Sequence, residues 1–158
     1  MSDNGNIIAC VSGGLSSFFC ADWALKNYPK DRIILYFNDT KWEHPDLYRF
    51  LSDIQNYLNH PILFDNDGRN PEQLFYDHHA LANDRMPFCS SVLKAERLQK
   101  FYKDGDTLIF GIGKEEINRA NRLIGRYQVV STKTDKYCKL EFPLIIKNIS
   151  PNTINAFM

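Results

Sequence analysis

Short runs of consecutive apolar residues alternate with helical patterns along this chain, and this alternation limits the possible folds more than any other feature. The runs that we expect to form buried strands are residues 7–11, 33–37, 62–64 and 107–110. The clearest helical pattern begins at Pro45 and keeps apolar residues on one face as far as Leu58. Strands that are apolar throughout and separated by helices form a parallel sheet covered on both faces. We therefore predict an α/β fold, a three-layer open sandwich with a mostly parallel five-stranded sheet and helices on both faces.

The rest of the chain completes this prediction. The other expected helices are residues 15–27, 71–79, 90–102 and 114–124. We expect the last strand within Gln128–Ser131, and we expect Phe142-Pro143-Leu144 to close a loop. A chain of 158 residues suits a single domain, residues 1–158.

The balance of charge and the cysteine pattern argue against several classes of protein. The chain carries 19 Lys and Arg against 19 Asp and Glu, whereas a dedicated nucleic-acid-binding domain is usually basic. Its 4 cysteines are far apart and form no CxxC pair, so we expect no disulfide scaffold and no metal site built from cysteines. The chain shows no apolar run of about 18 residues and no signal peptide, so we expect a cytoplasmic protein without a membrane partner.

The segment Ser12-Gly13-Gly14-Leu15-Ser16-Ser17 joins the first expected strand to the first expected helix. Paired glycines let several backbone N–H groups turn toward one point, and the N-terminus of a helix adds a partial positive charge. Such a loop can hold a phosphate group, although the segment is neither a Walker A loop nor a GxGxxG loop. The alternative is an ordinary strand-to-helix turn with serine as the N-cap.

Two more loops with polar side chains follow expected strands, at Asn38–Thr40 and Gly111–Glu116. In a parallel sheet with right-handed crossovers, the loops that follow the strands meet at the same edge of the sheet. Ligands of open α/β proteins bind at that edge. These loops and the loop at Ser12–Ser17 therefore predict one ligand site.

Five segments of this chain resemble motifs of a known family, and they occur in the same order as in that family. Val11-Ser12-Gly13-Gly14-Leu15-Ser16-Ser17 resembles the SGGxDS loop of the PP-loop adenine nucleotide alpha-hydrolases, and the most similar branch is the phosphoadenylyl-sulfate (PAPS) reductase-like one. The other segments are Asn38-Asp39-Thr40-Lys41 for the DTG-type segment, Cys89-Ser90-Ser91-Val92-Leu93-Lys94 for C[TS]xxxK, Gly111–Arg119 for Gly-Ile-Arg…Glu…Arg, and Phe142-Pro143-Leu144 for the late Pro-Leu element.

The resemblance implies a Rossmann-like (HUP) fold and a domain of sulfur metabolism that binds ATP or PAPS, with Mg²⁺ as cofactor. The positions that it assigns to nucleotide binding are Ser12, Gly13, Gly14, Leu15, Ser16, Ser17, Phe37, Asn38, Asp39, Thr40, Gly111, Ile112 and Glu116. It gives a catalytic role, the neutralisation of phosphate or sulfate charge, to Lys94, Lys114 and Arg119. Glu116 would orient Arg119, or the two would form an ordinary surface pair.

Three departures from the family pattern leave two functions open. Ser16 replaces the Asp of SGGxDS, Gly113 replaces the Arg of Gly-Ile-Arg, and the C-terminal region of the family, with its nucleophilic cysteine, is expected to be shortened. One function is an enzyme that transfers adenylyl groups or performs sulfur chemistry on PAPS, with an unidentified acceptor. The other is a nucleotide-binding or sequestering module, which could be a homodimer or a subunit of a larger complex.

Three other groups of residues have a functional and a structural interpretation. His78-His79 with Asp77 or Cys89 could bind zinc, although adjacent histidines point in different directions. Cys89 could be an activated nucleophile or an inert thiol. The stripe Arg119, Arg122 and Arg126 could contact a polyanion or form a solvated helix face.

Overall fold

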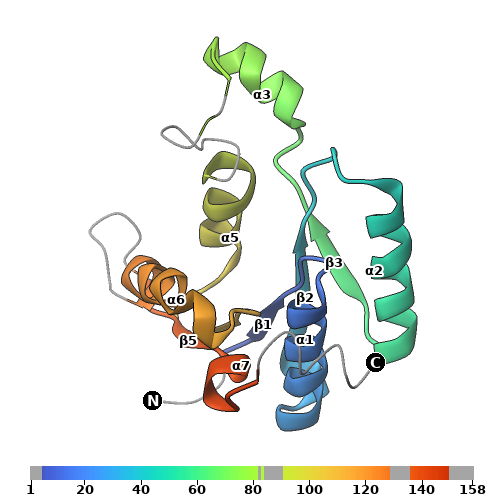
Figure 1. Ribbon diagram of the computed structural model, residues 1–158, viewed down its shortest axis with the longest axis vertical. Coiled ribbons are helices and arrows are strands. Elements are labelled where there is room, and N and C mark those ends of the chain that lie inside the picture. Colours follow the sequence, from blue (N-terminus) through green and yellow to red (C-terminus); the bar gives the residue numbers. More distant parts are fainter. Residues whose placement is uncertain (1–4, 82, 84–90, 129–135, 150–158) are drawn as a thin grey trace.

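The computed structural model describes residues 5–81, 83, 91–128 and 136–149, which form an α/β sandwich (Figure 1). One five-stranded sheet has the strand order β3-β2-β1-β4-β5, and every neighbouring pair is parallel. The strands are β1 (Ile7–Cys10), β2 (Ile33–Asn38), β3 (Ile62–Asp65), β4 (Thr107–Ile109) and β5 (Lys139–Glu141). The α/β fold with a five-stranded parallel sheet is therefore confirmed.

Helical segments connect the strands and flank the sheet. The α-helices are α1 (Leu15–Asn27), α2 (Pro45–Leu58), α3 (Pro71–His78), α5 (Glu96–Phe101), α6 (Ile117–Leu123) and α7 (Pro143–Ile146). The short segments are η1 (Lys30–Arg32), η2 (Ser91–Ala95), η3 (Lys114–Glu116) and η4 (Ile124–Gln128), of which η2 leads into α5 and η4 continues α6. Within the described residues, no helix is long and apolar enough to cross a membrane.

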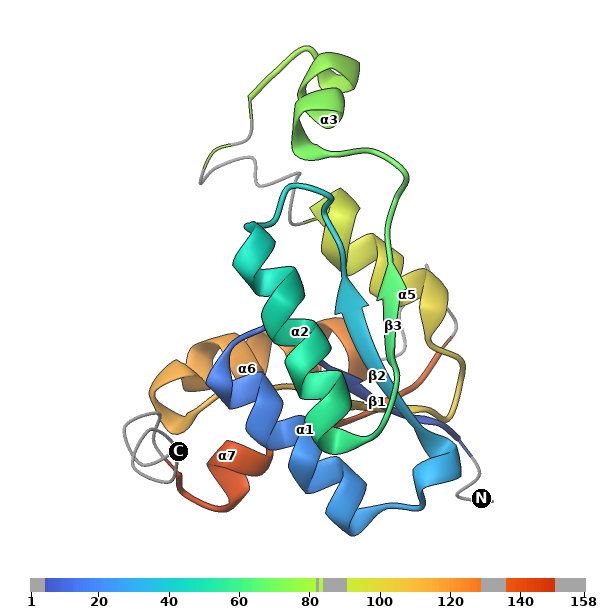
Figure 2. The same ribbon diagram turned by 90° about the vertical axis from the view of Figure 1, so that its right-hand side faces the viewer.

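The helices cover both faces of the sheet, with α1 and α2 on one side and α5 and α6 on the other (Figures 1 and 2). Side chains of β2 alternate between the two faces, as they do along any strand. Leu35 and Phe37 belong to the core beneath α1 and α2, and Tyr36 belongs to the core beneath α5 and α6. The helices therefore bury the apolar strands from both sides, as the unbroken apolar runs predicted.

The end of the chain differs from the prediction. The last strand is Lys139–Glu141 rather than Gln128–Ser131; Gln128 ends η4, and residues 129–131 lie outside the described residues. β5 is an edge strand paired only with β4, so one buried side chain, Leu140, is enough to hold it against the core. Phe142-Pro143-Leu144 does not close an irregular loop, because Pro143 begins the short helix α7.

The amphipathic helix α2 has the signals that its sequence predicts. Pro45 occupies its first turn, and the His44 side chain caps it by accepting a hydrogen bond from the Asp46 N–H. Leu51 and Ile54 are buried on the face that packs against the sheet. The helix ends at Asn59, which adopts the left-handed conformation. This helix fixes the far end of the loop that follows β2.

Leu35→Ala is expected to destabilise the fold by about 2–5 kcal/mol, because its fully buried side chain lies in β2, inside the sheet, and truncation leaves a cavity. Leu63→Ala, on the edge strand β3 where the side chain is exposed, is the matched control and should cost less than about 1 kcal/mol. Urea unfolding followed by circular dichroism measures both values. Equal losses for the two variants would contradict the placement of the core.

Candidate functional site

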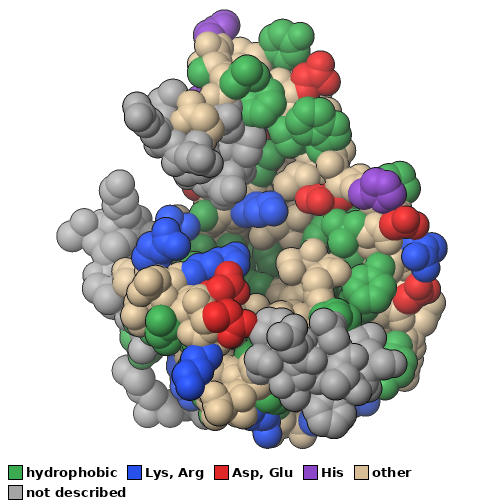
Figure 3. All heavy atoms as spheres, viewed as in Figure 1, with side chains coloured by type: hydrophobic (Ala, Val, Ile, Leu, Met, Phe, Trp, Pro, Cys, Tyr) green, Lys and Arg blue, Asp and Glu red, His purple; other side chains and the backbone are tan. Residues whose placement is uncertain are grey.

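A cleft of about 590 Å³ opens where the carboxyl ends of β1, β2 and β4 meet α5 and α6. Figure 3 shows this face of the molecule hollowed near its middle, with Lys and Arg side chains beside the hollow. The chain leaves β1 for β2 on one side and later returns to add β4 on the other side. Open α/β sheets bind ligands at such a change of direction. The fold therefore places a cleft at the edge of the sheet where the loops predicted a ligand site.

The structure brings about half of the predicted site residues to this cleft. Those that line it are Ser12, Ser17, Phe37, Asn38, Lys94, Gly111, Ile112 and Arg119. Those that do not line it are Gly13, Gly14, Leu15, Ser16, Asp39, Thr40, Lys114 and Glu116. Most residues of the second group are neighbours of lining residues in the same loops, so they support the cleft without lining it. Lys114 is exposed on η3.

The Ser17 hydroxyl organises the loop between β1 and α1. Its oxygen accepts hydrogen bonds from the Ser12 N–H (3.0 Å) and the Ser12 hydroxyl (3.2 Å), and its proton goes to the Gly14 carbonyl (2.9 Å). A hydroxyl has one proton and two lone pairs, so Ser17 has no further donor for a ligand. Helix α1 begins at Leu15 without a side-chain cap, which leaves the N–H groups of its first turn for an anion.

Two glycines allow the loops around the cleft to approach one another. Gly13 has a φ of +83°, in the left-handed region, and a Cβ there would lie 1.9 Å from Leu47 Cδ1. Gly111, just after β4, packs on the first loop: a Cβ there would lie 2.7 Å from Ser17 N and 2.8 Å from Ser16 C. The loops that follow β1 and β4 are therefore in direct backbone contact.

Hydrogen bonds also fix the loop that follows β2. The Tyr48 hydroxyl donates to Asp39 Oδ1 (2.6 Å), and burial, together with this contact, raises the pKa of Tyr48 to about 12. The same Asp39 oxygen accepts the Lys41 N–H (2.8 Å), which holds Lys41 at a positive φ of 61°. The Thr40 hydroxyl donates to Glu43, and Glu43 lines the cleft. Asp39 and Thr40 therefore support the loop and do not line the cleft.

Positive side chains outnumber negative ones around the cleft. Lys94, Arg119, Arg122 and Arg126 line it together with one carboxylate, that of Glu43. Arg119 forms an ion pair with Glu116 at 3.1 Å, a contact that is compatible with both predicted roles of Glu116. Within the described part of the chain, no carboxylate lies within ion-pair distance of Lys94, Arg122 or Arg126. This excess of positive charge suits an anionic ligand.

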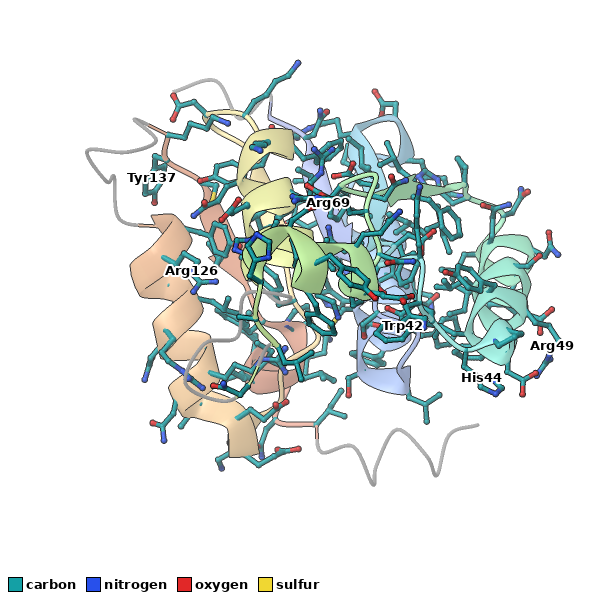
Figure 4. The ribbon with its side chains drawn as sticks, turned by 90° about the horizontal axis from the view of Figure 1, so that it is seen from above. Trp42, His44, Arg49, Arg69, Arg126 and Tyr137 are labelled. Carbon is teal, nitrogen blue, oxygen red and sulfur yellow. The ribbon has the colours of Figure 1, made fainter. Side chains whose placement is uncertain are left out.

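Arg122 and Arg126 were not among the predicted site residues, although their spacing with Arg119 had marked them as a stripe. The stripe lines the cleft and is not only a solvated helix face. Figure 4 shows Arg126 on the helical segment that continues α6, far from Trp42 and His44 in the loop after β2. The cleft is therefore bordered by positive charge on the α6 side.

The described cysteines are poor nucleophiles. Cys10 lies in the cleft wall, and burial raises its pKa to about 12; burial has the same effect on Cys20 and Cys138. A thiol with such a pKa stays protonated at neutral pH and does not attack readily. Cys89 and Ser90 of the predicted C[TS]xxxK segment lie outside the described residues.

The described residues hold no group of three His, Cys, Asp or Glu side chains that could bind a metal ion, and the zinc site with Cys89 cannot be placed because Cys89 lies outside them. Mg²⁺ usually needs only one or two carboxylates, with substrate phosphates completing its coordination. Glu43 is the one described carboxylate of the cleft wall that fits this role.

The comparison with known families agrees with this arrangement of loops. No curated protein matches the chain. The model of one family, described as the phosphoadenosine phosphosulfate reductase domain, matches residues 6–147, a stretch that contains the whole sheet and every described lining residue of the cleft. Because this match covers most of its 158 residues, the chain belongs to the phosphoadenosine phosphosulfate reductase domain family.

Proposed function

We propose that this protein binds an adenine nucleotide, ATP or PAPS, in the cleft and acts at its phosphate or sulfate group. One observation carries the proposal: Lys94, Arg122 and Arg126, which have no carboxylate partner among the described residues, border a cleft that Ser12 and Ser17, at the uncapped N-terminus of α1, also line. Unpaired like charges repel one another, so a site that gathers them is built for an anion. The family supports a nucleotide as that anion.

The proposed roles follow from position. The first-turn N–H groups of α1 would hold the phosphates, and Lys94 and Arg119 would neutralise charge that moves onto the leaving group. Arginine suits this task because its planar fork makes two hydrogen bonds to one phosphate. With ATP, an acceptor would attack the α-phosphorus and release pyrophosphate. With PAPS, a dithiol would displace adenosine 3′,5′-bisphosphate from the sulfonate and reduce the sulfonate to sulfite, and the dithiol would become a disulfide. Mg²⁺ would bind together with ATP, and Glu43 would be its protein ligand.

Calorimetry of the purified protein is expected to show that it binds PAPS or ATP, with an affinity that falls as the salt concentration rises, because ion pairs supply much of the binding energy. Product assays then separate the two substrates: pyrophosphate or AMP from ATP with Mg²⁺, and sulfite or adenosine bisphosphate from PAPS with a dithiol reductant. GTP is the control for base selectivity. Failure of both adenine nucleotides to bind at low salt would refute the proposal.

A binding or sequestering module is the second candidate, and two observations favour it. Ser16 stands where the family loop has a carboxylate. The cysteine in the cleft wall has a pKa raised to about 12, so it does not provide a thiolate. Tight binding of a nucleotide without any product over several hours would identify this function.

A further inference from the structure

We infer that the side-chain carbonyl of Asn38 recognises the base of the nucleotide by accepting a hydrogen bond from its exocyclic amino group. This inference rests on the proposed function, because it concerns the nucleotide in the same cleft. Asn38 is the last residue of β2 and lines the cleft; no other carboxamide side chain does so among the described residues. Tyr36, two residues earlier, lies on the same face of the strand and also lines the cleft.

A chain of hydrogen bonds fixes the orientation of the Asn38 amide. Arg97 Nη2 donates to Asp65 Oδ1 at 2.6 Å, so this oxygen of Asp65 is an acceptor. The Tyr36 hydroxyl donates its only proton to the other oxygen of Asp65, at 2.5 Å. The hydroxyl oxygen can then only accept, and Asn38 Nδ2 donates to it at 3.0 Å. The amide nitrogen of Asn38 therefore points toward Tyr36.

The components of this chain are held in place by the fold. Asp65 ends β3 and pairs in register with Asn38 on β2, so the strand ladder sets their separation. Tyr36 is buried, and burial together with Asp65 raises its pKa well above the ordinary value, so that the phenol keeps its proton. The ring of Tyr36 packs against Phe101 of α5 with 4.7 Å between the centroids. The buried Tyr36 and its partner Asp65 thus determine the orientation of the Asn38 amide.

The remaining oxygen of Asn38 has no hydrogen-bond partner among the described residues, although the side chain lines the cleft. A carbonyl that cannot turn is a fixed acceptor, and it matches the amino group of adenine. Hypoxanthine has an oxygen in place of that amino group and would set two acceptors against each other. A site that hydrogen-bonds one group rejects the analogue that lacks it, because a polar group is left unpaired.

ATP and ITP differ in this group and at N1, which is an acceptor in adenine and carries a proton in hypoxanthine. The ratio of their dissociation constants, compared between the wild type and the variants, therefore measures the inference. The wild-type protein is expected to bind ATP with an affinity about tenfold or more above that for ITP. ATP gains one hydrogen bond, whereas ITP places its oxygen against the carbonyl oxygen of Asn38. Asn38→Ala should bring the ratio close to one by weakening ATP. Tyr36→Phe should also lower the ratio, but by strengthening ITP, since the freed amide can rotate and present its nitrogen to the oxygen of hypoxanthine. A purely structural role of Tyr36 would weaken both nucleotides equally.

Asn56→Ala, an exposed amide on α2, is the matched control and should leave the ratio unchanged. Thermal unfolding of each variant shows that it is folded. An unchanged preference for ATP in a folded Asn38→Ala protein, or equal binding of ATP and ITP by the wild type, would overturn the inference and leave the proposed function intact. If the wild-type protein binds neither PAPS nor ATP, both the inference and the proposed function are overturned.

Discussion

Gly111→Ala is expected to lower the affinity for nucleotide by about a hundredfold, because a hydrogen bond from the first loop to a charged phosphate contributes about 1.5–3 kcal/mol. The new methyl group would lie 2.7 Å from Ser17 N and 2.8 Å from Ser17 Cα. These are backbone atoms, which cannot rotate away as a flexible side chain can. The loops after β1 and β4 would have to separate, and the N-terminus of α1 would leave its place at the cleft. Calorimetry with PAPS and ATP measures the loss.

The control for Gly111→Ala is Gly125→Ala. Gly125 lies in η4, and a Cβ there would meet no atom within 4 Å. This variant should bind nucleotide as the wild type does, because it changes glycine to alanine without changing any contact. Wild-type affinity in Gly111→Ala would show that contact between the two loops does not position the site.

The double variant Arg122→Glu, Arg126→Glu is expected to lower the affinity for nucleotide by at least about a hundredfold. A hydrogen bond to a charged group contributes about 1.5–3 kcal/mol, and two arginines that face one anion can each lose such a bond. Reversal of charge adds repulsion to this loss. The affinity of the variant should also depend less on salt than that of the wild type, because fewer ion pairs form on binding.

The control carries the same change of net charge far from the cleft. Lys30→Glu, Lys147→Glu replaces two exposed lysines that do not line the cleft. If the affinity depends only on the total charge of the protein, both double variants will lose it equally. If the arginines contact the ligand, only Arg122→Glu, Arg126→Glu will lose it, and an equal loss would contradict their placement.

The fold could be predicted from the sequence because its strongest signals are local. Unbroken apolar runs such as Ile7–Cys10 and Ile33–Phe37 indicate strands buried on both faces, and the helical spacing between them indicates crossovers. The last strand was missed because Lys139–Glu141 has one apolar residue. An edge strand takes its stability from tertiary packing, and no local pattern reveals that packing.

The site could be predicted only in part. Loops that follow strands identify the edge of the sheet, so Ser12, Asn38 and Gly111 could be assigned to one cleft. Spacing alone could not show whether the stripe through Arg122 and Arg126 faces solvent or the cleft, because that depends on how α6 is rotated against the sheet. The hydrogen-bonded pair formed by Tyr36 and Asp65 joins two strands and appears only in three dimensions.

The positive charges around the cleft also affect the protein when no nucleotide is bound. Lys94, Arg122 and Arg126 repel one another in the empty cleft, and any small anion that enters relieves this repulsion. A bound anion stabilises the folded state by mass action, so inorganic phosphate or sulfate in the buffer should raise the melting temperature. The same ions compete with nucleotide for the cleft. If the protein is purified and titrated in buffers that contain phosphate or sulfate, the measured affinity for nucleotide will therefore be lower than the true affinity.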